Sequence, residues 1–240
     1  MLGNSAWVVA ADADFFIHGL VKYKLFGHEL WITNTHVSLL IIDICLIIFM
    51  LCARRCIKKA TMNPSGFQNF IEIIVEFVDN MVGDVLGKEG KRFRNYIGVL
   101  LVFLLVCNLS GLLGLRAPTA DYAVTLPLGV ITFCMIQYCG IKKNKIKHFS
   151  ELFEPFPIMF PINLIGEIAV PFSLSLRLFG NVMSGTVMMG LAYGLFPVIV
   201  RVIGVPSLLH MYLDIFSGII QAYVFCMLTM VYISGKILDD

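Results

Sequence analysis

Long apolar stretches alternate along this chain with short clusters of basic residues. Four stretches are apolar enough to cross a bilayer as single helices, and they cover residues 37–51, 96–115, 123–141 and 208–233. A further apolar region, between residues 151 and 201, is longer than one ordinary span. The pattern predicts an all-α, polytopic membrane protein that forms a single domain over residues 1–240.

Composition supports the same fold class. Of the 240 residues, 58% are hydrophobic and 14% are charged, which is too few to coat a soluble globule. The formal net charge of +2 gives no reason to expect a nucleic-acid partner. The seven cysteines are scattered, lie mostly inside apolar runs and form no CxxC pair. We therefore interpret them as small apolar side chains, in preference to disulfide partners or metal ligands.

The basic clusters predict the orientation in the membrane. All three fall on the same side of the predicted spans: Arg54, Arg55, Lys58 and Lys59; Lys88, Lys91, Arg92 and Arg94; and Lys142, Lys143, Lys145 and Lys147. Since basic residues are enriched on the cytoplasmic side, segment 1–35, with its interfacial aromatic residues, is expected outside and the C-terminus inside. The N-terminus lacks the basic region of a signal peptide, and the absence of a transit peptide favours a bacterial plasma membrane.

Residues 66–87 predict a helix of a different kind. Its apolar side chains gather on one face, whereas Glu72, Glu76 and Asp84 fall largely off that face. The apolar face consists of Phe67, Phe70, Ile71, Ile74, Phe77, Val78 and Met81. Such a pattern is typical of an amphipathic helix lying on a membrane, so we expect residues 66–87 on the inner surface and not across the bilayer.

The hydropathy of region 151–201 fits two interpretations. In the first, Arg177 marks a turn between two ordinary spans, and its guanidinium reaches an interface. In the second, residues 161–193 form one helix of about 33 residues, roughly 50 Å long against a hydrocarbon core of ~30 Å. Such a helix must tilt or bend, and Pro171 makes bending easier. The pattern of apolar residues leaves both open.

Arg177 is the residue in this region that most needs an explanation. A charged side chain at membrane depth costs at least ~2.5 to 3.5 kcal/mol on insertion scales. At helical spacing, Ser173, Arg177, Asn181, Ser184 and Gly185 lie along one stripe. Ordinary packing of small residues explains the glycine and the serines, but it does not explain the arginine. We therefore interpret the stripe as a functional surface that lets another element come close.

The last predicted span also carries polar residues on one face. Asp214, Ser217, Gly218 and Gln221 share that face, and His210 lies one turn before Asp214. A carboxylate in a membrane helix is expensive unless it lines water or meets a partner. Two alternatives are open: Asp214 lines an aqueous path, or it pairs with His210 alone.

The acidic residues fall on either side of Arg177. Glu167 lies close to three turns before Arg177, toward the inner surface, whereas Asp214 lies in the outer half of its span. A carboxylate can accept and release a proton, whereas arginine stays charged. This distribution is what two separate aqueous half-channels would need.

Three further polar residues have no clear assignment from the pattern. Asp43 in the first span faces water, a partner helix or a lipid headgroup. Asn108 and Asp121 either line an outer opening or serve local packing and capping.

The chain closely resembles the a subunit of F-type ATP synthases. The resemblance rests on SLSLRLFGNVMSG at 173–185, preceded by PINLIGEIAVP at 161–171 and followed by QAYVFCMLTMVYIS at 221–234, and it extends over about 31–235. It implies one long helix carrying Arg177, and a tilted helical hairpin over 161–235 that faces a ring of c subunits.

The resemblance also implies roles for single residues. Arg177 matches the essential arginine that faces the c-subunit carboxylate, keeps it ionised and blocks leakage between the half-channels. Asn181 and Gln221 match polar residues of the outer half-channel, and Glu167 matches an inner-side acid. Thr186 stands where many members have glutamate, and Asp214 where they often have histidine or glutamate, so we expect Asp214 to be the main outer relay. Residues expected to line the channel are Ser173, Ser184, Thr186, Ser217, His210, Asn108 and Asp121.

The resemblance further implies that the chain is no enzyme on its own but a stator subunit that couples ion flow to rotation and ATP synthesis. The partners it implies are the c-ring, the b subunit of the peripheral stalk and the other synthase subunits. The chain has no glycine-rich phosphate loop, so we expect no nucleotide binding, and we expect neither a cofactor nor a metal.

Two other functions would make different demands on the sequence. A secondary transporter with Arg177 as a midplane anion site predicts inverted repeats, and the sequence has none that we can recognise. An intramembrane enzyme with His210 and Asp214 as metal ligands needs a third ligand at a sensible spacing, which the sequence does not supply.

Overall fold

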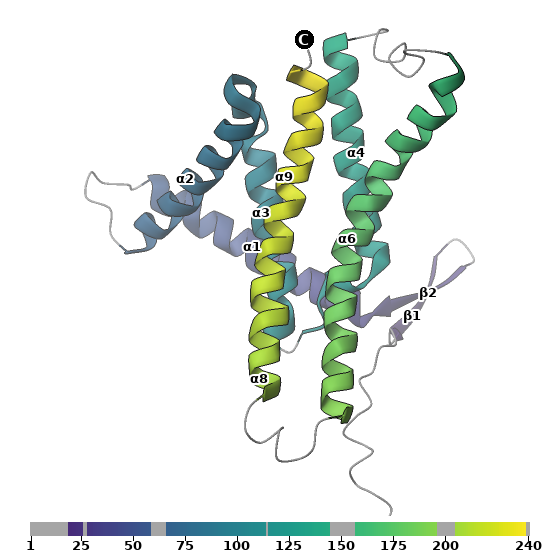
Figure 1. Ribbon diagram of the computed structural model, residues 1–240. Coiled ribbons are helices and arrows are strands. Elements are labelled where there is room, and N and C mark those ends of the chain that lie inside the picture. The colour runs from purple at the N-terminus through teal and green to yellow at the C-terminus, as the bar shows by residue number, and fades with distance from the viewer. Residues whose placement is uncertain are drawn as a thin grey trace, which may run out of the picture.

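The computed structural model describes residues 19–25, 28–58, 66–113, 115–144, 157–195 and 205–238. Two strands come first, β1 (Gly19–Leu25) and β2 (His28–Thr33), and the rest of the described chain is almost entirely helical (Figure 1). The main helices are α1 (Asn34–Lys58), α2 (Gly66–Leu86), α3 (Arg94–Leu109), α4 (Tyr122–Asn144), α6 (Phe160–Leu195), α8 (Val205–His210) and α9 (Ser217–Leu238). Short 3₁₀ turns are η1 (Gly87–Arg92), η2 (Ser110–Leu113), η3 (Pro118–Ala120) and η4 (Pro157–Met159), and η5 (Met211–Phe216) is a π-helical segment that joins α8 to α9.

Within the described ranges, five helices are long and apolar enough to cross a membrane. They are Asn34–Lys58, Arg94–Leu113, Tyr122–Lys143, Phe160–Ala192 and Leu208–Ile237. These helices confirm the predicted all-α membrane fold. They also decide between the two interpretations of the region around Arg177, because that residue lies inside α6, a single helix of 36 residues that continues through Pro171.

The five helices differ in their inclination. In Figure 1, α3, α4 and α9 run roughly alongside one another, α6 is inclined to them, and α1 crosses behind at a steep angle. The C-terminal end of α9 and the start of α6 lie at one end of the bundle, and α8 lies at the other. Residues near Glu167 and residues near Asp214 therefore belong to opposite ends of the bundle.

The hairpin of β1 and β2 was not predicted. The sequence predicted an outer-face segment over 1–35 and no strand within it, and residues 1–18 lie outside the described part of the chain. The strands pair antiparallel, with Lys22 opposite Trp31, and the Lys22 ammonium lies 4.3 Å from the centroid of the indole ring. The alternation of apolar and charged residues in VKYKL is the period-two signal that could have revealed it.

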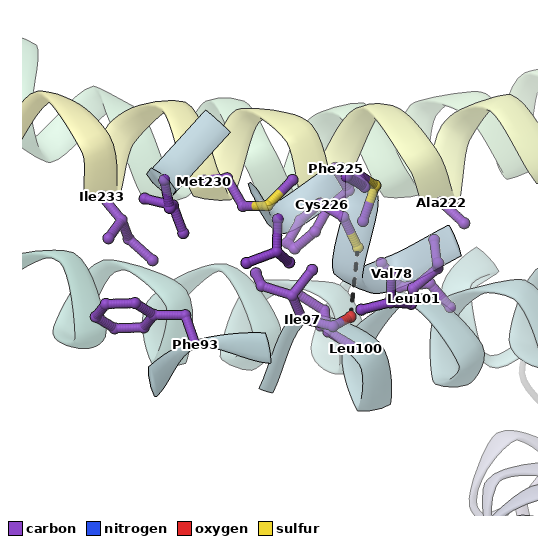
Figure 2. Close-up of a cluster of buried hydrophobic side chains, with 14 of the residues drawn as sticks. Val78, Phe93, Ile97, Leu100, Leu101, Ala222, Phe225, Cys226, Met230 and Ile233 are labelled. Atoms are coloured by element: carbon purple, nitrogen blue, oxygen red, sulfur yellow. Dashed lines mark hydrogen bonds between the residues drawn. The ribbon is translucent and has the colours of Figure 1, made fainter. Parts of the chain in front are cut away.

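The core lies where α9 packs against α3, and α2, α4 and α6 add side chains to it. Buried residues of α9 recur every three or four positions, so they form one stripe on the helix. Figure 2 shows this stripe, Ala222, Phe225, Cys226, Met230 and Ile233, against Phe93, Ile97, Leu100 and Leu101 near the start of α3 and Val78 of α2. This packing holds α9 in place independently of its polar residues.

α2 inclines away from the bundle (Figure 1). Ile71, Val78 and Met81 from the predicted apolar face are buried, whereas the rings of Phe67 and Phe77 are about half exposed. The apolar face is thus divided between the bundle and the surroundings. Its placement on the inner membrane surface stays a prediction.

α4 and α6 approach each other closely at Gly129. A Cβ atom at this position would lie 2.7 Å from the carbonyl oxygen of Pro171 and 3.3 Å from the Cβ of Ser175. Only a residue without a side chain permits this separation, as is common where membrane helices pack. The contact holds α6 in place near Arg177. On this helix Arg177 lies ten residues after Glu167 and six after Pro171.

Candidate functional site

Arg177 lies on the side of α6 that faces away from the bundle. Its neighbours Leu174 and Leu178 are almost completely buried in the core, whereas Arg177 itself is exposed. Ser173 and Ser184 are exposed on the same side. Of the residues that the structure describes, none forms a hydrogen bond or an ion pair with the guanidinium of Arg177. Helical periodicity therefore presents a fixed cation to whatever covers this face.

A cavity of about 440 Å³, with both polar and apolar walls, lies between α6 and the start of the last span, beside η3. Its polar lining comes from α1, α3, α6, α8, η5 and the turn before η3, so the cavity brings together residues far apart in the sequence. The polar side chains include Asn108, Arg116, Asn181, Thr186, His210 and Asp214. Three of the residues expected to line a channel, Asn108, Thr186 and His210, thus share one cavity with Asn181 and Asp214, and Arg116 is a member that was not predicted from the sequence.

Asp214 lies in the π-helical segment η5. Its Oδ2 atom is 2.7 Å from Nδ1 of His210, and about a quarter of the Asp214 side chain is exposed. π-helical turns often occur at functional sites, because they change which side chains face a given direction. Asp214 therefore pairs with His210 and also lines the cavity, so the pairing is not its only contact, and its place on an aqueous path stays a prediction.

Asn181 connects the two long helices. The hydroxyl of Ser217 donates to Oδ1 of Asn181 at 2.7 Å, so α6 and α9 are linked beside the cavity. Ser184 is exposed and donates to the carbonyl oxygen of Asn181, and Thr186 donates to the carbonyl oxygen of Val182. The predicted stripe therefore divides: Asn181 turns toward α9, whereas Ser184 stays on the outer side with Arg177.

Asn108 combines packing with a place in the cavity wall. Its side chain is buried, donates from Nδ2 to the carbonyl oxygen of Gly218 at 3.0 Å and accepts at Oδ1 from Thr119 at 3.0 Å. A Cβ atom at Gly218 would lie 3.2 Å from the Cβ of Asn108, so α3 and α9 are in close contact there. Asp121 accepts from the backbone N–H of Ala123 at the start of α4, which supports the capping alternative.

Glu167 lies at the other end of the bundle. Lys236 of α9 donates to one carboxylate oxygen at 2.8 Å, and Gln137 of α4 donates to the other at 3.1 Å. About a quarter of each charged side chain is exposed. The carboxylate thus joins three helices, and neither partner was predicted from the sequence, because the contacts cross between helices.

Two polar residues do not join these groups. Gln221 is buried on α9, lies outside the cavity lining, and its Nε2 atom has no hydrogen-bond partner in the described parts of the chain. Asp43 is exposed on α1 and also lies outside that lining.

Within the described residues no group of three or more histidine, cysteine, aspartate or glutamate side chains could hold a metal ion, which leaves His210 and Asp214 without a third ligand.

Comparison with known proteins identifies the family. Residues 36–234 match the family described as ATP synthase A chain. The chain belongs to this family. The matched residues of the ATP synthase A chain family include Glu167, Arg177 and Asp214, whereas Lys236 lies just beyond them.

Several relatives are ATP synthase subunits a of bacteria. The sodium ion specific subunit a of Propionigenium modestum is 40% identical over 199 residues, which cover 76% of this chain and 67% of the relative. Subunit a of Priestia megaterium is 36% identical over 234 residues, covering 89% and 99%. Subunit a of Listeria welshimeri is 36% identical over 221 residues, covering 85% and 92%. Membership favours a multi-pass subunit of the F-type ATP synthase membrane sector over a secondary transporter.

Proposed function

We propose that this subunit forms two aqueous half-channels that carry ions to and from carboxylates on a ring of c subunits. Ion flow would then drive rotation of the ring and, through the other subunits, ATP synthesis. The subunit itself contributes no nucleotide chemistry and acts as the stator of the ion path. The observation that carries this proposal is an outward-facing Arg177, unpaired among the described residues, between the cavity lined by Asp214 and the cluster around Glu167.

The spacing along α6 supports two separate half-channels. In the cavity wall, Asn181 follows Arg177 by about one turn and Thr186 follows it by about two and a half turns, whereas Glu167 precedes it by about three turns. The cavity and the cluster are therefore on the order of 25 Å apart along the helix, at 1.5 Å per residue. In this proposal an ion passes from one to the other only on a carrier that moves past Arg177.

The chemistry of Arg177 suits a barrier between them. The guanidinium does not give up its proton, so it cannot relay one. It favours the ionised form of a carboxylate that comes within a few ångströms, which releases the proton carried there. A proton that crosses the membrane delivers about 2.3 kcal/mol per 100 mV, and this energy is usable only where a direct leak is blocked.

Asp214 is the proposed relay of the outer half-channel. It shares the cavity with Thr186, which is the position where many members of the family carry glutamate. The relay carboxylate is thus supplied by the last span and not by α6, and His210 is placed to exchange a proton with it. Glu167 is the proposed acid of the inner half-channel, and Gln221 and Asn181 are proposed to assist transfer near the ring.

The exposed side of α6 is the proposed contact with the c-ring. Ser173, Gly180 and Ser184 are exposed there around Arg177, and small side chains let a moving helix come close. The b subunit and the remaining synthase subunits would contact other faces. We propose that the N-terminus lies outside and the C-terminus in the cytoplasm of a bacterial plasma membrane.

The test of the proposal is Arg177→Ala in the assembled synthase in sealed vesicles. We expect no ATP synthesis driven by an ion gradient, while Leu176→Ala, an exposed neighbour on α6, keeps most of it. Normal synthesis by Arg177→Ala would refute the proposal. Because one relative is named sodium ion specific, synthesis should be driven by a proton gradient and by a sodium gradient in separate experiments.

A second pair of variants tests the outer relay. Asp214→Asn is expected to slow ion translocation far more than Thr186→Ala, because only the former removes a group that can exchange a proton. Equal and mild effects of the two substitutions would place the relay elsewhere.

A further inference from the structure

A second cavity lies at the end of the bundle where α4 and α9 terminate, and it has no role in the proposed ion path. It has a volume of about 300 Å³, is open on one side, and is lined by residues of η1, the last turns of α4 and the end of α9. Its lining includes Arg92, Lys142 and Lys143, together with Glu89 and the rings of Phe93 and Tyr138. It is therefore a cavity with basic and apolar walls, three cations and one carboxylate.

The turn after α2 positions one side of this cavity. Gly87 has a φ of +55°, a left-handed conformation that ends α2 and redirects the chain into η1. Gly90 packs tightly against Val82, because a Cβ atom there would lie 2.7 Å from a methyl carbon of that valine. The backbone that carries Glu89 and Arg92 is thus held against α2.

The other side is held by contacts of the two lysines. The ammonium of Lys143 donates to the carbonyl oxygen of Ile237 at 2.5 Å, which ties α4 to the end of α9. The ammonium of Lys142 lies 5.8 Å from the centroid of the Tyr138 ring. Both lysines therefore stand at the wall of the cavity in defined positions.

The apolar wall is what distinguishes this cavity from a site for a free anion. Phe93 is buried in the core, whereas Tyr138 is 62% exposed on α4, a helix apolar enough to span the membrane. Aromatic side chains of this kind are typical of the level where headgroups meet acyl chains. A ligand that fills the cavity meets cations on one side and an apolar surface on the other.

We propose that this cavity binds the phosphate headgroup of an anionic phospholipid, whose glycerol and first acyl carbons lie against Tyr138 and Phe93. Basic cavities between membrane helices on the cytoplasmic side are suited to anionic headgroups, and arginine and lysine both bind phosphate. The cavity lies on the side assigned to the cytoplasm by the basic clusters. The proposal does not depend on the ion path through Arg177.

The experiment measures binding of a spin-labelled phosphatidylglycerol to the whole synthase complex in phosphatidylcholine nanodiscs. The variant replaces Arg92, Lys142 and Lys143 by glutamine. Each basic residue near the surface is worth about fivefold in affinity for an anionic lipid. The three substitutions together should therefore weaken phosphatidylglycerol binding at least tenfold. The matched control replaces Arg54, Arg55 and Lys58, which are exposed at the end of α1, by glutamine, and it should change binding less than twofold.

Glu89, the carboxylate in the cavity, allows a test in which phosphatidylglycerol binding should become tighter. Glu89→Gln removes a repulsive charge, so phosphatidylglycerol should bind several-fold tighter. Weaker binding in this variant would overturn the proposal, as would an equal loss in the control triple variant, which would show general surface attraction. Arg92→Gln alone should still weaken binding measurably, and it replaces the triple variant if the latter fails to assemble.

Competition distinguishes the sources of the phosphate. Millimolar glycerol phosphate should leave the bound phosphatidylglycerol in place, because it lacks the acyl chains. Displacement at that concentration would show a site for small soluble anions and refute the lipid proposal. Failure of phosphatidylglycerol to bind because an acidic segment of another subunit fills the cavity would refute it as well.

Discussion

Substitution of Gly129 by alanine should separate the two helices on which the arginine site depends. The added Cβ atom would lie 2.7 Å from the carbonyl oxygen of Pro171, which is backbone and cannot rotate away. Relief requires α4 and α6 to move apart by about 0.7 Å before ordinary van der Waals contact begins. Because Arg177 lies only six residues beyond Pro171 on the same helix, it would move with α6.

The expected cost follows from the kind of clash. Overpacking of a well-packed interior typically costs about 1 to 3 kcal/mol, and a clash with backbone belongs in the upper part of that range. A glycine-to-alanine change inside a helix also gains about 1 kcal/mol from helix propensity. A control variant with the same change at an uncrowded helical glycine shares this gain, so the gain cancels when the two variants are compared. Gly83→Ala on α2 serves as the control, since a Cβ atom there meets nothing within 4 Å.

The assay is unfolding of the purified chain by SDS in mixed micelles, with the two variants compared directly. We expect Gly129→Ala to be about 2 kcal/mol less stable than Gly83→Ala. In the assembled synthase, ion-driven ATP synthesis should fall several-fold in the former variant and stay normal in the latter. Equal stability of the two variants would show that α4 and α6 are not held by this contact.

Three further predictions concern side-chain contacts between helices. Asn108→Ala should cost about 1 to 3 kcal/mol in free energy of unfolding, measured by SDS titration, because it leaves buried hydrogen-bonding groups without partners. Lys236→Gln should reduce stability by about 1 kcal/mol, the usual scale for a partly exposed ion pair, and Glu167→Gln should not add to this loss in the double variant, as a double-mutant cycle would show. Ser217→Ala should cost about 1 kcal/mol, and it should have no effect once Asn181 is replaced by alanine.

Helix periodicity and hydropathy were sufficient to predict much of the membrane fold. The apolar stretches and the basic clusters between them are local features, and each predicted span corresponds to a helix of the structure. The same reasoning could not choose between one helix and two around Arg177, because hydropathy fits both, and the resemblance favoured the single helix that α6 realises. The hairpin of β1 and β2 was missed because an interfacial segment was expected there.

Contacts between helices were harder to predict. The pairing of Glu167 with Lys236 joins residues 69 positions apart, and the bond from Ser217 to Asn181 joins residues 36 apart. No periodicity within one helix specifies which side chains of another helix it will meet. The separation of Asn181 from the outward stripe follows from the same cause, since its hydrogen bond to α9 decides which way it turns.

By itself, the sequence determined that a charged Arg177 lies within an apolar helix, with acids before and after it along the chain, because these are matters of composition and spacing. The tertiary structure alone decided that Thr186 and Asp214 share one cavity and that Gln221 lies outside its lining. The way the helices cross determines which side chains share a cavity. The crossings in turn depend on where glycines such as Gly129 and Gly218 allow close approach. The π-helical turn at Asp214 is likewise a feature of the packed chain, and it decides which side chains of the last span reach the cavity.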